Sequence, residues 1–249
     1  MKKNKQTFKV LLLCIICLGI GFAFISCSEE DNKKEKYECA TCTDTPDALA
    51  VNDNSIKGVY KGTVVGSSGS VFIDIQNGSN TITARIVLDG TTINLISNVS
   101  LVEGEPYIAP FEGTYNGEPI TVVFSVGLNG SDPTIITSDI PGHPNAVFMV
   151  YKETSTSLIE AFEGEFMVGG DSGIFNIVLS REINKWEGIA KKNNSASEVT
   201  EIGGTINSNN ELIQSESGKK LGTISGDTVS GSFTDEDGES VTFSGQRTL

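Results

Sequence analysis

Apolar and polar residues alternate along most of the chain from Ser55 onward. Clear examples are 81–88, where Ile82, Ala84, Ile86 and Leu88 share one side, and 121–126, where the apolar residues again fall at every second position. A period of two is typical of strands that bury one face. No window of ten residues has the i, i+3, i+4, i+7 spacing of an amphipathic helix. The pattern therefore predicts antiparallel strands and very little helix.

Turn-forming pairs separate these alternating segments. Asn-Gly, Asp-Gly and Gly-Gly pairs favour tight hairpins, because their residues tolerate the positive φ angles that such turns require. The pairs are Asn77-Gly78, Asp89-Gly90, Asn116-Gly117, Asn129-Gly130, Gly169-Gly170, Asn209-Asn210 and Asp237-Gly238. We expect most connections to be hairpins between strands that follow one another in the chain.

A short motif recurs at several of these segments. An apolar residue is followed two positions later by Gly and four positions later by a bulky residue, and an alternating segment comes after the next turn. The copies are centred on Gly62, Gly113, Gly164 and Gly231, and the first three are spaced 51 residues apart. A glycine within a strand permits the bend or close approach that a closing sheet needs. The motif favours internal duplication, although a glycine-rich meander could also produce such matches by chance.

These patterns predict an all-β fold. The expected architecture is an antiparallel meander that closes into small barrels or packs as a sandwich, built from two tandem related units at 55–151 and 160–249. Six of the seven prolines lie between Pro106 and Pro144, which predicts an irregular, loop-rich section in the first unit. Because loops on a rigid sheet often carry recognition, this section is the expected contact surface.

The N-terminal segment follows a different pattern. Four lysines precede an uncharged apolar run at 10–25, which ends at Ser26-Cys27 and is followed by acidic residues. The run of 16 residues is shorter than the roughly 20 that a spanning helix needs, and the whole segment has the order of a secretory signal. Phe24-Ile25-Ser26-Cys27 resembles the lipobox of bacterial lipoproteins. The resemblance implies that residues 1–26 are a signal peptide and that Cys27 becomes the acylated, palmitate-bearing N-terminus.

The four residues that directly follow Cys27 suggest the location to which the protein is exported. Ser28, Glu29, Glu30 and Asp31 resemble the surface-export signal of bacteroidete-type lipoproteins. The resemblance implies a lipid-anchored protein on the outer membrane of a Gram-negative bacterium, facing outward; the alternative is an acidic start to a linker. The mixed charges at 32–36 favour a hydrated chain without regular structure, so 27–54 is expected to be a flexible tether.

Two cysteines remain in the expected mature chain besides Cys27. Cys39 and Cys42 form a CxxC motif, while Cys14 and Cys17 leave with the signal peptide. In an oxidising compartment this spacing favours a local disulfide. Intermolecular pairing or free thiols, a redox motif and a metal site remain as alternatives; the residue after Cys42 is Thr43, so a haem attachment sequence is not present.

The charge of the chain limits its partners. The 249 residues carry a net charge of −14, and removal of residues 1–26 takes away four lysines and leaves −18. A chain this acidic is repelled by nucleic acids and by anionic lipid. We expect no nucleic-acid partner, membrane contact through the N-terminal lipid, and a surface protein or glycan as the possible partner.

No catalytic or metal-binding constellation stands out in the sequence. The single histidine, His143, lies between two prolines in an expected surface turn, so neither a Ser-His-Asp triad nor a histidine metal site is supported. Residues 235–239 resemble part of a calcium loop but are better explained as a solvated hairpin turn. Trp186 is interpreted as a core residue, with a sugar-stacking platform as the alternative. We predict no catalytic residue, no metal and no cofactor.

The sequence thus favours a non-catalytic binding or structural module whose ligand is unknown. The alternative is a glycosidase-like surface hydrolase, because that chemistry needs only two carboxylates and the chain has 32 acidic residues.

The first prediction concerns the anchor. Metabolic labelling with a palmitate analogue should label the wild-type protein, whereas Cys27→Ala should remain unlabelled and leave the membrane fraction. Cys39→Ala serves as the control, because it removes a cysteine outside the lipobox. A labelled, membrane-bound Cys27→Ala protein would contradict the lipoprotein hypothesis.

Overall fold

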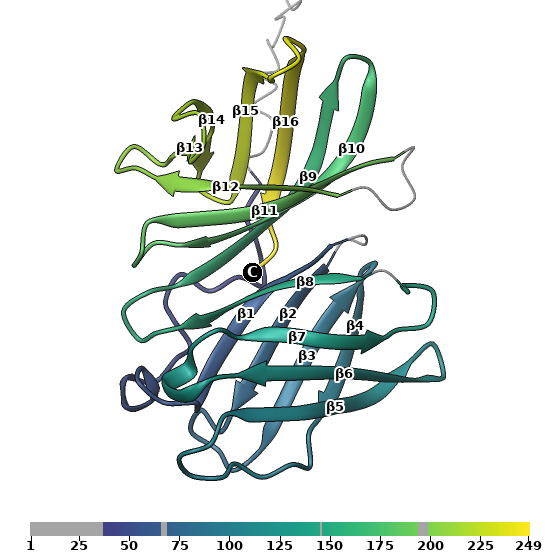
Figure 1. The fold of residues 1–249 in the computed structure, drawn as a ribbon, viewed down its shortest axis with the longest axis vertical. Coiled ribbons are helices and arrows are strands. Elements are labelled where there is room, and N and C mark those ends of the chain that lie inside the picture. The colour runs from purple at the N-terminus through teal and green to yellow at the C-terminus, as the bar shows by residue number, and fades with distance from the viewer. Residues whose placement is uncertain (1–36, 66–68, 145, 194–198) are drawn as a thin grey trace, which may run out of the picture. The chain divides into compact units, whose positions relative to one another are not determined.

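The computed structural model describes residues 37–249 except 66–68, 145 and 194–198. Across this part of the chain the structure consists of sixteen strands and two short 3-10 helices, η1 (Ala50–Asn52) and η2 (Leu128–Gly130). The strands form two antiparallel sheets of eight strands each (Figure 1). The predicted all-β antiparallel meander is confirmed. No helix in the described ranges is long and apolar enough to cross a membrane. Cys27 and residues 28–31 lie outside those ranges.

The first sheet has the order β7-β6-β5-β4-β3-β2-β1-β8. Its strands are β1 (Gly58–Val65), β2 (Gly69–Ile75), β3 (Ile82–Leu88), β4 (Thr91–Ile96), β5 (Tyr107–Tyr115), β6 (Glu118–Val126), β7 (Thr134–Asp139) and β8 (Val147–Glu153). β8 pairs with β1, and the two edge strands β7 and β8 lie next to each other without forming a regular ladder. The first sheet is therefore a nearly closed barrel.

The second sheet is a closed barrel in which every strand has two partners. Its strands are β9 (Ile159–Val168), β10 (Asp171–Ser180), β11 (Lys185–Lys192), β12 (Thr200–Ile206), β13 (Glu211–Gln214), β14 (Lys220–Ser225), β15 (Thr228–Thr234) and β16 (Ser240–Arg247). Consecutive strands pair as hairpins, and the last strand pairs with the first, with Phe243 opposite Phe166. Closure leaves this sheet without an exposed edge.

The hairpins form where the sequence places residues that accept a positive φ. Asn116 (φ 53°) and Gly117 (φ 87°) connect β5 to β6, and Asp89 (φ 47°) and Gly90 (φ 75°) connect β3 to β4. Two successive positive φ angles are characteristic of the type I′ turn, whose twist matches that of paired strands. These local signals explain why strand order follows chain order in both sheets.

The two sheets share one topology, and the repeated glycine has the same place in each. Gly62 on β1 lies between Val71 on β2 and Val150 on β8. Gly164 on β9 lies between Phe175 on β10 and Gly245 on β16. A Cβ atom on Gly62 would overlap the carbonyl oxygen of Met149, and one on Gly164 would overlap that of Ser244. The glycines therefore permit the close approach of the first and eighth strands of each unit.

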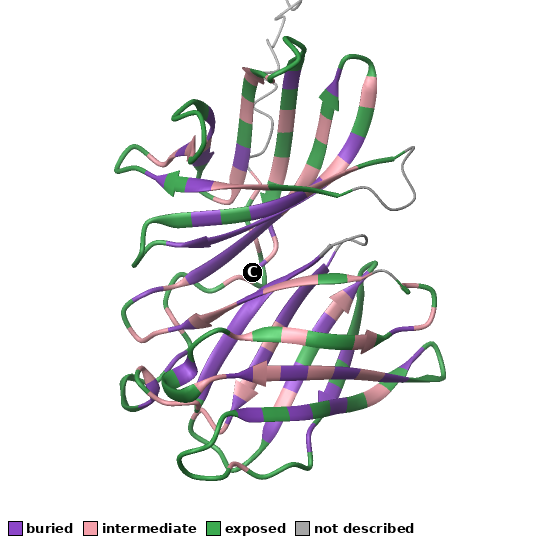
Figure 2. Cartoon of the chain, viewed as in Figure 1, coloured by how far each residue is buried: buried purple, intermediate pink, exposed green. Residues whose placement is uncertain are grey.

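The interior of the first sheet is filled by side chains. Buried and exposed residues alternate along its strands (Figure 2), as expected for a sheet with one solvated face. Tyr60 and Phe111 each pack edge-to-face against Phe124, with ring centroids 5.2 and 6.2 Å away. Large aliphatic side chains from β2, β3 and β4, such as Ile73, Ile86 and Leu95, complete this core.

The proline-rich section differs from the prediction. Residues 106–144 contain three regular strands, β5, β6 and β7, rather than an irregular loop region. Pro110 lies within β5 opposite Val123 of β6. On its other side β5 pairs with β4 only at Glu112, opposite Ile96, so the N–H group that proline lacks is not needed there.

The predicted tether also differs from the structure at its C-terminal end. Between Tyr37 and Asn54 the chain packs against the sheets instead of extending freely. The Tyr37 hydroxyl donates a hydrogen bond to the Arg247 carbonyl oxygen at 3.0 Å, and the Asn52 amide donates to Asn77 at 3.0 Å. Ala48 and Asn52 are buried. Polar composition alone predicted a flexible segment, but specific partners far along the chain hold these residues in place.

A buried ion pair fixes the end of the first sheet. The Lys61 ammonium of β1 lies 2.8 Å from Glu153 of β8 and 2.8 Å from Asp47. The Glu153 side chain is fully buried, and its carboxylate also accepts hydrogen bonds from the backbone N–H groups of Asp47 (2.6 Å) and Ile159 (3.1 Å). The Lys61 charge is thus compensated by two carboxylates and the Glu153 charge by partners from three chain segments, which is the condition for burying them.

Removal of one partner should be costly. Lys61→Met keeps the apolar stem but leaves the Glu153 carboxylate buried without its cation, so the free energy of unfolding should fall by about 3–5 kcal/mol. Lys57→Met, which removes an exposed lysine just before β1, should change it by less than about 0.5 kcal/mol. Urea denaturation measures both. A loss below 1 kcal/mol for Lys61→Met would show that the ion pair does not stabilise this end of the first sheet.

Candidate functional site

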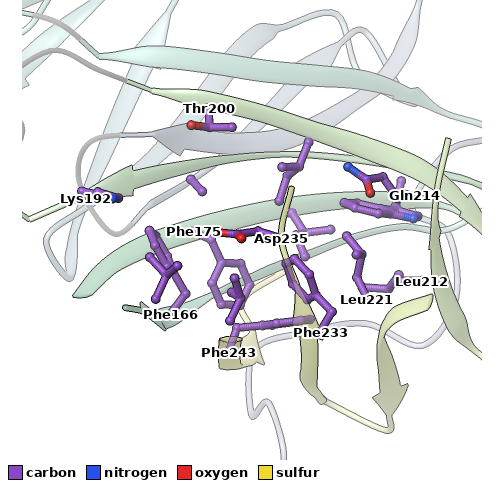
Figure 3. A pocket seen from close by; sticks show the side chains of 16 residues that line it. Phe166, Phe175, Lys192, Thr200, Leu212, Gln214, Leu221, Phe233, Asp235 and Phe243 are labelled. Atoms are coloured by element: carbon purple, nitrogen blue, oxygen red, sulfur yellow. The ribbon is translucent and has the colours of Figure 1, made fainter. Parts of the chain in front are cut away.

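The second barrel encloses a cavity of about 360 Å³. It runs along the barrel interior and receives side chains from all eight strands. Its lining residues are Phe166, Val168, Phe175, Ile177, Trp186, Ala190, Lys192, Thr200, Ile202, Leu212, Gln214, Leu221, Phe233, Asp235, Val241 and Phe243 (Figure 3). Most of them are apolar, and an eight-stranded barrel is just wide enough either to be filled by side chains or to hold one small ligand.

Aromatic rings form one wall of this cavity. The Phe175 and Phe243 rings meet edge-to-face with centroids 5.4 Å apart, and Phe233 lies 6.4 Å from Phe243 on the other side (Figure 3). Phe166, Phe233 and Phe243 are only partly buried although they point into the barrel. Their exposed ring surface therefore belongs to the cavity wall, whereas the central rings of the first sheet are completely buried.

Glycines on the neighbouring strands make room for these rings. Gly222 on β14, Gly231 on β15 and Phe243 on β16 lie side by side across the sheet. A Cβ atom on Gly222 or Gly231 would come within 2.5 Å of the Phe243 ring. The Phe243 ring thus lies against backbone and occupies the volume that two side chains would have taken.

Trp186 lies near one end of the cavity. It is 1% exposed, and its indole N–H donates to the carbonyl oxygen of Thr205 at 3.2 Å. Trp186 is near the start of β11 and Lys192 is at the end of this strand, so the two side chains lie at opposite ends of the barrel. The interpretation of Trp186 as a core residue agrees with its burial, and the structure adds that it borders the cavity.

The chain closes the barrel at the Trp186 end. Arg247, at the end of β16, is buried and donates to the carbonyl oxygens of Leu249 (2.9 Å) and Thr43 (2.5 Å). Its guanidinium also lies 3.3 Å from Asp227 and 3.8 Å from Glu160. Access to the cavity is therefore expected from the other end.

The Lys192 end carries most of the polar residues of the lining. Lys192 lies 3.1 Å from Asp171, which follows the turn between β9 and β10. The hydrogen bond and charge of Asp171 raise the pKa of Lys192 above its usual value, so the amine stays protonated at neutral pH. Asp235 and Thr200 complete the polar rim, whereas Gln214 lies across the cavity from Lys192, in register with Gly204 and hence with Trp186 (Figure 3).

The structure joins Cys39 and Cys42 in a disulfide with 5.4 Å between their Cα atoms. The Cys39 N–H donates to the Asp227 carboxylate at 2.8 Å. The bridged loop is thus attached to the closed end of the second barrel through the same aspartate that faces Arg247. The CxxC motif is a structural element of this contact and lies away from the polar rim of the cavity.

The other residues considered in the sequence do not assemble into a site. His143 lies in a turn 3.5 Å from Asp89 and packs against Tyr115. Residues 235–239 form the β15–β16 turn, in which the Glu239 N–H donates to Asp235 at 2.8 Å. In the part of the chain that the structure covers, no group of three or more histidine, cysteine or acidic residues is arranged to hold a metal ion.

Comparisons with known proteins leave the site as the basis for interpreting function. No protein-family model matches the chain, and no curated protein matches it either.

The cavity residues were not identified from the sequence. Period-two alternation marks inward positions, but it does not tell whether the inward side chains fill the barrel. The available signal was the type of residue at the inward positions. The second unit has glycines there, at Gly204, Gly222, Gly231 and Gly245, whereas the first unit has valine, isoleucine and leucine on β2 to β4.

The packing of Phe243 over glycine can be tested. In Gly231→Ala the new methyl group would overlap the carbonyl oxygen of Leu221 and press on the Phe243 ring, so stability should fall by about 1–3 kcal/mol. Ser232→Ala, at the next and outward-facing position, should stay within about 0.5 kcal/mol of wild type. Thermal and urea unfolding give both values. Equal stability of the two variants would show that the ring has space to move.

Proposed function

We propose that the protein is a lipid-anchored, non-catalytic binding protein of the bacterial cell surface, and that its second barrel binds a small, mainly apolar ligand. The observation that carries the proposal is the hollow interior of this closed barrel. Two sheets of the same topology occur in one chain, yet aliphatic and aromatic side chains fill the first while the second retains a cavity of about 360 Å³.

The character of the cavity supports binding of a small molecule. Its volume falls within the roughly 300–1,000 Å³ typical of ligand pockets, which are mostly apolar with a few polar groups that orient the ligand. Here Lys192, Thr200 and Asp235 lie toward one end, and aromatic and aliphatic side chains provide most of the remaining wall. An apolar molecule that covered the partly buried phenylalanine rings would gain roughly 25 cal/mol for each Å² of apolar surface removed from water.

The same geometry favours binding over hydrolysis. A glycosidase needs two carboxyl groups on either side of the bond that it cleaves. Among the residues that line the cavity in the described part of the chain, Asp235 is the one carboxylate. The other described acids at the mouth, such as Asp171 and Glu239, lie outside this lining, and Asp235 alone does not supply the acid and base of that reaction.

The N-terminal region supports a role at the cell surface. The lipobox at Cys27 and the acidic residues after Ser28 resemble the anchor and export signal of surface lipoproteins. The described chain begins at Tyr37, which is attached to Arg247 at the closed end of the barrel. The described residues 37–44 thus contact the end of the barrel opposite Lys192 and Asp235.

The proposal can be tested with an uncharged apolar dye. N-phenyl-1-naphthylamine should become fluorescent on binding, and excitation of Trp186, the only tryptophan of the chain, should transfer energy to it. Ala190→Phe adds a ring inside the cavity and should weaken binding at least tenfold. Met167→Phe places the same ring on the outer wall, where Met167 is 58% exposed, and should bind as wild type does.

The controls separate cavity binding from adsorption. Circular dichroism and thermal unfolding must show that both variants fold. If the dye does not bind, or binds equally well to Ala190→Phe, the barrel interior is not the binding site and the proposal fails.

A further inference from the structure

We infer that the ligand is an amphipathic cation, with an apolar body that enters the aromatic cavity and an amine or quaternary ammonium group that remains at the polar rim. This inference rests on the proposed function and adds the chemical class of the ligand. Three observations support it: the charge of the mouth, the pairing of its lysine and the nature of the cavity wall.

The mouth of the barrel is acidic. Three described turns surround it, between β9 and β10, between β13 and β14, and between β15 and β16. Together with the strand ends beside them they carry six acidic residues, Asp171, Glu216, Asp235, Glu236, Asp237 and Glu239, against three lysines, Lys192, Lys219 and Lys220. A narrow opening with low-dielectric walls focuses such a field, which raises the local concentration of cations and lowers that of anions.

Asp235 and Glu239 are held at this opening rather than free to turn away. Asp235 lines the cavity, and its carboxylate accepts the Glu239 N–H at 2.8 Å, which orders the turn. The Glu239 carboxylate packs against Gly169, where a Cβ atom would come within 2.5 Å of it. Two acids are thus fixed beside the cavity by a backbone hydrogen bond and by a glycine contact.

The lysine at the mouth does not create a site for an anion. Lys192 is the one cation among the lining residues described, and its ammonium already lies 3.1 Å from Asp171. A carboxylate ligand would have to displace Asp171 and also approach Asp235 against like-charge repulsion. A cationic ligand would instead pair with the acidic residues of the mouth, which outnumber its lysines.

The wall below the mouth suits a cation with an apolar body. Phe166, Phe175, Phe233 and Phe243 present ring surface to the cavity, and the negative face of an aromatic ring attracts an ammonium group or the polarised methyl groups of a quaternary amine. The same rings provide apolar contact area for the rest of the molecule. Aromatic rings and acids together therefore favour a cationic head group over an anionic or neutral one.

Three probes that share a ten-carbon chain can test this inference: decyltrimethylammonium, 1-decanol and decanoate, each below its micelle concentration. Binding to the intact protein is followed by Trp186 fluorescence and by displacement of N-phenyl-1-naphthylamine. We expect decyltrimethylammonium to bind at least about fivefold more tightly than 1-decanol, and decanoate to bind most weakly. A rise in NaCl from 20 to 500 mM should reduce the advantage of the cation, because salt screens the mouth.

Charge variants locate the effect. Asp235→Asn/Glu239→Gln keeps the Asp235 side-chain acceptor for the turn and removes two charges, so decyltrimethylammonium affinity should fall about three- to tenfold while 1-decanol affinity stays the same. Glu165→Gln/Glu201→Gln removes the same charge from exposed outer-wall positions of this barrel and should change neither affinity. Lys192→Gln frees Asp171 and should tighten binding of the cation.

The outcomes distinguish this inference from the function on which it rests. If 1-decanol or decanoate binds as tightly as the cation, and Ala190→Phe still blocks them, the barrel is a binding site for apolar molecules and the cationic class is wrong. Weaker decanoate binding in Lys192→Gln, with the cation unaffected, would assign the ligand an anionic head group instead. If none of the three probes and no dye binds, the proposed function fails together with the inference.

Discussion

Closure of the second sheet is the constraint on which the candidate site depends. Once β16 pairs with β9, every strand has two partners, and the diameter of the interior is set by the number of strands and their tilt. The sheet cannot collapse around small side chains as a helical core can. Inward glycines such as Gly222 and Gly231 therefore leave space for the Phe243 ring, while backbone hydrogen bonds around the whole barrel maintain the width of the interior.

The two units show how one backbone plan gives two interiors. Tyr60 in the first unit and Phe162 in the second stand two residues before the repeated glycine, and each is opposite a cation of the eighth strand, Lys152 or Arg247. Lys152 lies over the Tyr60 ring at 5.3 Å from its centroid, and burial lowers its pKa to about 8. The units share this end arrangement, whereas their interiors differ, since the first is filled by side chains and the second contains the cavity.

Much of the fold could be predicted from the sequence because its signals are local. Asp-Gly and Asn-Gly turns and period-two alternation gave the all-β antiparallel meander, and the spacing of Gly62 and Gly164 matches the first strands of the two sheets. The long-range partners were not predictable in this way. Nothing near Tyr37 or Cys39 indicates that Arg247 and Asp227, about 200 residues later, hold that segment. The prediction of loops for the proline-rich section was wrong because a proline is tolerated in a strand where its missing N–H has no partner. Pro110 meets this condition, since β5 pairs with β4 only at Glu112.

The cavity was missed for a related reason, and the reason bears on its function. Alternation records which residues face inward, whereas a cavity arises from the summed volume of inward residues on strands that meet only in three dimensions. Phe175, Phe233 and Phe243 come from three strands spread over about 70 residues, yet their rings form one wall. A core that needed only stability would bury the Phe233 and Phe243 rings completely, as the first unit buries Tyr60, Phe111 and Phe124. Rings kept partly exposed inside a closed barrel lose apolar contact area that a bound molecule restores, which is why the hollow unit, and not the filled one, is the place to look for a ligand.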